Sequence, residues 1–88
     1  MILTMSILVV EIVCPSTSRS YDFKIPSDMK AENIKSHLIE DIRLFEGSPE
    51  LFRDKEAEIC LFSVKGQLSG NETLESAGVK TGDRLTLV

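Results

Sequence analysis

The apolar residues in the first half of the chain change their spacing at Pro26, and this change strongly constrains the fold. Before Pro26, apolar and polar residues alternate, as they do in half-buried β-strands. From Ala31 onward, apolar residues recur at the three- and four-residue spacing of an amphipathic helix. A chain that makes two strands and then a helix must return to the sheet, so the sequence predicts an α+β fold with the helix on one sheet face.

One charged residue fixes the register of the first predicted strand, SILVVEIVC. Glu11 shares an alternating set with Ile7 and Val9, and a slip of one residue would bury its carboxylate. We therefore expect that set to lie on the outer face, although Ile7 and Val9 are more apolar than solvent requires. The set expected to face the core is Leu8, Val10, Ile12 and Cys14.

A polar turn at residues 15–20 joins this strand to a second alternating run, YDFKI, as in a β-hairpin. In the following helix, Ser27 or Asp28 is the expected N-cap and Gly47 the expected end. Its predicted apolar face consists of Ala31, Ile34, Leu38, Ile42 and Phe45. Strands are then expected within EICLFSV, around Leu68, and in RLTLV after the turn Thr81-Gly82-Asp83.

Charge and the apolar start of the chain bear on its location and partners. The net charge is −4, and no dense cluster of Lys and Arg offsets it, so nucleic acid and anionic membrane surfaces are not expected partners. The run MILTMSILVVEIVC lacks the basic segment and cleavage site of a signal peptide, and Glu11 interrupts it. At about 14 residues it is too short to cross a bilayer as a helix. A cytoplasmic location follows by default.

No residue pattern in the sequence is typical of catalysis or of cofactor and metal binding. There is one His, no glycine-rich phosphate loop and no cluster of metal ligands. The neighbouring acids Glu56 and Glu58 would need a cleft that a domain of this size rarely has. Cys14 and Cys60 lack CxxC spacing, and a disulfide would form only if the fold brought them together; two small buried, reduced thiols are expected. The sequence predicts no enzyme and no cofactor.

Two segments carry a resemblance to a known family: IPSDMKAENIKSHLI and GQLSGNETLESAGVKTGDRLTLV. Over roughly Ser6 to Val88 the chain resembles the ubiquitin-like β-grasp superfamily, and it is most similar to the bacterial YukD/EsaB proteins. The resemblance implies a mixed sheet of four to five strands packed on one amphipathic helix. The length of 88 residues predicts a single domain over residues 1–88, in which residues 1–5 are expected to be an extended or tag-like start.

The same resemblance implies a noncatalytic protein-interaction module, an accessory or regulatory component of a type VII (WXG-type) secretion system. Ubiquitin-type modifiers and sulfur carriers act through a tail ending in Gly-Gly, whereas this sequence finishes in a predicted strand at Val88. We therefore expect neither activity. Two alternatives stay open: a modifier or sulfur carrier whose diglycine tail is missing, and a ubiquitin-like domain excised from a larger membrane channel protein.

The predicted protein-binding site lies on the sheet face opposite the helix. By similarity to the recognition patch of ubiquitin, Phe62, Thr86 and Val88 are expected together there, with Ile7 and Val9 adding apolar area. The expected partner is a component of the secretion machinery, and self-association is a second option. Alternatively, Phe62 is an ordinary exposed apolar residue, or residues 1–5 cover it.

Overall fold

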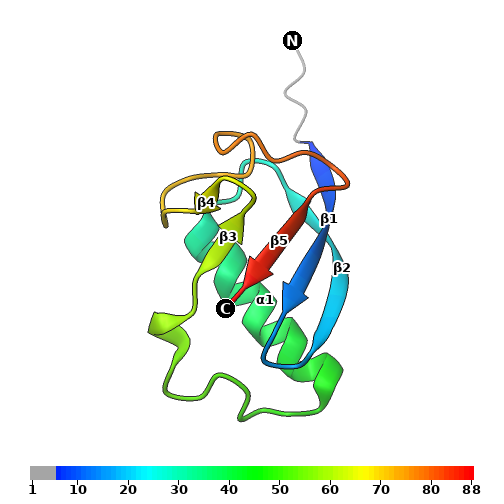
Figure 1. Ribbon diagram of the computed structural model, residues 1–88, viewed down its shortest axis with the longest axis vertical. Helices are drawn as coiled ribbons and strands as arrows, with labels where there is room; N and C mark the ends of the chain where they lie inside the picture. The colour runs from blue at the N-terminus through cyan, green and yellow to red at the C-terminus, as the bar shows by residue number, and fades with distance from the viewer. Residues whose placement is uncertain (1–5) are drawn as a thin grey trace.

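In residues 6–88, which the computed structural model describes, five strands form one mixed sheet and one α-helix crosses a face of it (Figure 1). The elements are β1 (Ile7–Cys14), β2 (Arg19–Pro26), α1 (Ala31–Glu46), the 3₁₀ turn η1 (Glu56–Glu58), β3 (Leu61–Ser63), β4 (Gly66–Gln67) and β5 (Arg84–Leu87). The strand order is β2-β1-β5-β3-β4. This is the predicted ubiquitin-like β-grasp, so the fold prediction is confirmed.

The centre of the sheet joins the two ends of the described chain. β1 pairs antiparallel with β2, which follows it through a short turn, and parallel with β5. The predicted register of β1 is confirmed, because Val10, Ile12 and Cys14 are buried and Leu8 packs half-buried against the core, while Ile7 and Val9 are exposed. Most of the core lies between this centre and α1.

The start of α1 differs from the sequence prediction. Neither Ser27 nor Asp28 caps the helix; the N-cap is Lys30, and its side chain makes no capping hydrogen bond. The first helical amides instead donate to backbone carbonyls of a later loop, Ala31 N to Glu72 O (2.7 Å) and Glu32 N to Gly70 O (3.1 Å). Tertiary contacts thus satisfy donors that a side chain satisfies in most helices, so the local cap signal was misleading.

The predicted apolar face of α1 is correct except at its last residue. Ala31, Ile34, Leu38 and Ile42 are buried, but Phe45 is 68% exposed. Instead of entering the core, Phe45 stacks on Tyr21 of β2, with ring centroids 6.1 Å apart and planes 11° apart. Gly47 ends the helix in the left-handed conformation, at φ 61°, as the sequence predicted.

Candidate functional site

The sheet face opposite α1 brings three of the predicted binding residues together. Phe62 of β3 lies directly across from Thr86 of β5 in the antiparallel pair. Val88 exchanges two backbone hydrogen bonds with Cys60, of 2.7 and 3.0 Å, so the pairing continues past the end of β5. Because side chains alternate along a strand, Val88 projects from the same face as Thr86. Phe62 and Thr86 are half-buried, and Val88 is 47% exposed.

A fourth residue, Val13, belongs to this group although the sequence did not single it out. Thr86 pairs with Phe62 on one side and with Val13 of β1 on the other. The sequence places Val13 in the outward set of its strand, but only the parallel register shows which residue of β1 lies beside β5. We refer to Phe62, Thr86, Val88 and Val13 as the open-face cluster.

Ile7 and Val9 lie on the same open face but near the other end of β1. They are 50% and 40% exposed. Val13 is six positions after Ile7 along the strand, a span of roughly 20 Å. The two apolar areas are therefore separate parts of one face, and a role in protein binding for Ile7 and Val9 stays a prediction.

An ion pair lies between these two apolar areas. Arg84 Nε donates to Glu11 Oε1 over 2.8 Å, across the parallel pair of β5 and β1. The hydrogen bond from Arg84, and then one from Ser20, lowers the pKa of the Glu11 carboxyl. Each side of the ion pair thus carries an apolar surface, and the centre of the open face carries paired charges.

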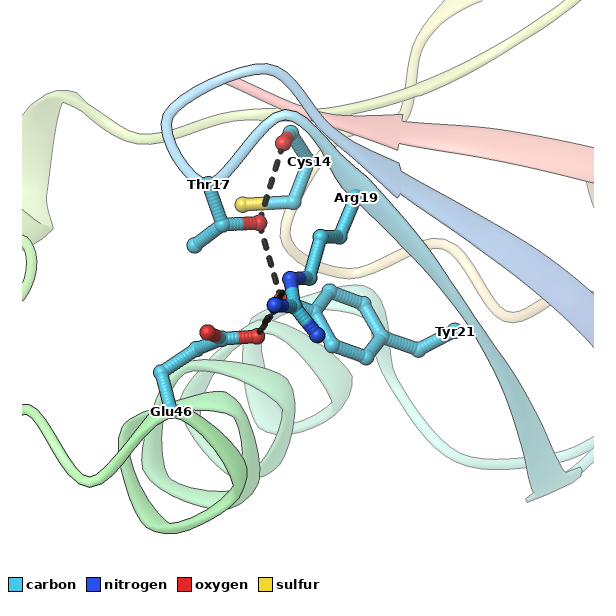
Figure 2. A network of polar contacts seen from close by, with 5 residues as sticks. All are labelled: Cys14, Thr17, Arg19, Tyr21 and Glu46. Atoms are coloured by element: carbon cyan, nitrogen blue, oxygen red, sulfur yellow. Dashed lines mark hydrogen bonds and ion pairs between the residues drawn. The ribbon is translucent and has the colours of Figure 1, made fainter.

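A polar network on the other side of the sheet joins the hairpin turn to the end of α1 (Figure 2). Tyr21 OH donates to Glu46 Oε2 over 2.6 Å and lies 2.8 Å from Thr17 Oγ1. Thr17 Oγ1 also lies 3.2 Å from the carbonyl oxygen of Cys14, and Arg19 Nε is 3.7 Å from Glu46. The network therefore fastens the turn between β1 and β2 to the helix.

The chemistry of this network points to a structural role. Two hydroxyl protons serve three close oxygen contacts, and the Tyr21 proton goes to Glu46 because a charged acceptor forms the stronger bond. The Thr17 proton is then shared between the Cys14 carbonyl and Tyr21 OH. Burial, followed by the bond to Glu46, raises the pKa of the Tyr21 phenol. A phenol that holds its proton more tightly is a poorer general acid, and less of it is present as tyrosinate, the form that acts as nucleophile or base, at neutral pH.

The acids and thiols considered from the sequence are not gathered into a catalytic constellation. Glu56 and Glu58 are both exposed, and the carboxylate of Glu56 pairs with the guanidinium of Arg43. Cys14 is buried, Cys60 is half-buried, and both are free thiols. Within residues 6–88, no three His, Cys, Asp or Glu side chains are grouped so that they could hold a metal ion. In the same stretch, no helix has the length and hydropathy needed to cross a membrane.

Comparisons with known proteins agree with the fold described above. The family described as "WXG100 protein secretion system (Wss), protein YukD" matches residues 7–87. Ubiquitin from Caldiarchaeum subterraneum superposes with a TM-score of 0.67 at 18% identity, covering 93% of this chain and 91% of the other. An N-terminal ubiquitin-like domain solved in solution gives 0.68 at 14% identity, covering 97% and 76%. A designed protein based on ubiquitin gives 0.65 at 20% identity, covering 93% and 87%. No curated protein sequence matches.

Proposed function

This chain belongs to the YukD family of WXG100 protein secretion systems, and on that premise we propose that it acts there by binding another protein. In this proposal it is a noncatalytic accessory protein in the cytoplasm. Its binding surface is the open face of the sheet, centred on the open-face cluster. The partner is a component of the secretion machinery.

The observation that carries the proposal is the row formed by Phe62, Thr86 and Val13. These residues lie side by side on three neighbouring strands, and no described element packs over them (Figure 1). Because strand pairing already orders the backbone of Phe62, a partner that covers the ring does not have to order that backbone as well. Such a ring with aliphatic neighbours is a common centre of protein interfaces.

The test is affinity capture from lysate of the source cells, with bound proteins identified by mass spectrometry. Wild-type protein is compared with Phe62→Glu, which places a charge at the centre of the row. Phe45→Glu is the matched control, because it makes the same change at an exposed phenylalanine on α1. Thermal melts of all three proteins establish that each is folded.

Each outcome decides the proposal. We expect secretion-system components with wild type and with Phe45→Glu, and their loss with Phe62→Glu. If Phe62→Glu retains the same components, the open face is not the binding surface. If folded wild-type protein captures no such component, the proposed role is wrong.

A further inference from the structure

The strand β2 has one edge without a partner in the described part of the chain. It is the outermost strand of the sheet and pairs with β1 alone (Figure 1). At eight residues it is as long as β1, whereas the strand at the opposite edge, β4, has two. A long free edge presents a row of backbone donors and acceptors that can pair with another strand.

The hydrogen bonds of β1 show which residues of β2 direct their backbone groups outward. Ser27 N donates to Ser6 O over 2.8 Å, so these two residues form a hydrogen-bonded pair. Pairs alternate in an antiparallel ladder, so the odd-numbered residues of β2 bond to β1. The amides and carbonyls of Ser20, Asp22 and Lys24 therefore lie on the free edge.

We propose that this edge pairs with the same edge of a second copy of the chain, in an antiparallel register centred on Phe23. The register follows from charge. With Phe23 opposite Phe23 of the second copy, Asp22 lies opposite Lys24 of that copy, and by symmetry Lys24 lies opposite its Asp22. Two cross-strand ion pairs then form between the side chains of Asp22 and Lys24, whose backbone groups also bond across the new pair of strands.

Neighbouring registers are unfavourable. The partner strand can slip by two residues and still place the outward backbone groups of both strands opposite each other. Such a slip moves the centre of the pairing from Phe23 to residue 22 or residue 24. One such shift places two Asp22 side chains opposite each other, and the other places two Lys24 side chains opposite each other. Charged residues on an edge strand usually discourage pairing, but in the Phe23-centred register every charge meets its opposite.

The side chains of β2 on the helix side of the sheet could also pack against the same side chains of a second copy. Phe23 would meet its symmetry mate in the closely spaced, non-hydrogen-bonded pair, and Tyr21 would lie opposite Ile25 of the second copy. A groove of about 220 Å³ runs beside this edge, and Phe23, Ile25 and Met29 are among its lining residues. The exposed ring of Phe45 lies 6.2 Å from the ring of Phe23. The pairing would thus bury apolar area on the helix side while the ion pairs form on the open side.

The test uses charge reversal and charge exchange, with dimerisation measured by sedimentation equilibrium from micromolar to millimolar protein. Lys24→Glu and Asp22→Lys each place like charges opposite each other, and each should raise the dimer dissociation constant about tenfold or more. The double variant with Asp22→Lys and Lys24→Asp restores opposite charges in the same register and should recover most of the lost affinity. Both side chains are exposed, so the fold should tolerate the changes.

A second measurement locates the contact on the backbone. Amide hydrogen exchange of Asp22 and Lys24 should slow as the protein concentration rises, because these amides become bonded only in the dimer. The amide of Phe23 bonds to β1 and should be protected at every concentration. A monomer throughout the concentration range, or a dimer insensitive to both single reversals, overturns the proposal. A dimer abolished by Phe62→Glu would instead assign self-association to the open face.

Discussion

Arg84 and Glu11 are 73 residues apart in sequence, and their side chains form a 2.8 Å hydrogen bond across the parallel strands β5 and β1. The bond joins the last described strand to the first at the centre of the open face. Both side chains lie on the face away from the core, that of Arg84 exposed and that of Glu11 half-buried, so the pair can be altered without disturbing the core.

The first prediction concerns the acid sensitivity of this pair. The pKa of Glu11 is lowered in the folded protein, so its contribution to stability is present above the unfolded pKa and is lost as pH falls through the folded value. Glu11→Gln should lower the melting temperature at neutral pH. At pH values well below about 4, variant and wild type should melt together. Melts across this range by circular dichroism measure the difference, and a constant gap at all pH values would contradict the prediction.

The second prediction concerns Tyr21, the only tyrosine in the chain. Its raised pKa places tyrosinate formation above the ordinary value of about 10. The associated stability is therefore present below that value and is lost as pH rises through the folded pKa. A pH titration followed by the absorbance of tyrosinate measures the pKa of this one residue directly. Glu46→Gln should lower the midpoint only in part, because burial, the larger cause, remains. A Glu46→Gln midpoint equal to that of wild type would show that Glu46 makes no contribution.

The third prediction tests whether the loop between β4 and β5 is part of the core. Leu74 in that loop is fully buried, so Leu74→Ala should cost about 2–5 kcal/mol, a large share of the total stability of a small domain. Leu44→Ala is the matched control, since Leu44 is 76% exposed on α1. Urea unfolding should show a large loss for the first variant and a change within about 0.5 kcal/mol for the second. Equal effects would contradict the prediction.

The fourth prediction concerns the end of α1. Gly47 has φ 61° and no atom within 4 Å of an added Cβ, so the cost of a side chain there comes from the backbone alone. Gly47→Ala should cost about 1 kcal/mol. Gly47→Asn should cost less, because asparagine tolerates the left-handed conformation better than other non-glycine residues do. The free energies of unfolding rank the three proteins, and an asparagine variant less stable than the alanine variant would refute the explanation.

Much of the fold could be predicted from local patterns. Glu11 alone settled which face of β1 is buried, and the helical spacing from Ala31 to Ile42 identified the face of α1 that packs on the sheet. The family resemblance was also correct, since the YukD family matches residues 7–87.

The errors and omissions share one physical cause, which is contact between distant parts of the chain. The cap of α1 comes from carbonyls of Gly70 and Glu72, which no local signal reveals. Val13 enters the open-face cluster through the parallel register with Thr86. Phe45 has helical spacing yet stays exposed, and it stacks on the ring of Tyr21 in β2. The alternative in which residues 1–5 cover Phe62 lies outside the described residues.

The pairing of β1 with β5 affects when the domain can fold during synthesis on the ribosome. During synthesis β1 emerges first and β5 last, so β1 has no partner on its β5 side until nearly the whole domain has left the ribosome. The first amides of α1 likewise cannot form their hydrogen bonds until Gly70 and Glu72, which supply the carbonyl acceptors, have been synthesised. Folding of the domain is therefore expected to wait for the synthesis of β5, and until then the nascent chain leaves one edge of β1 unpaired.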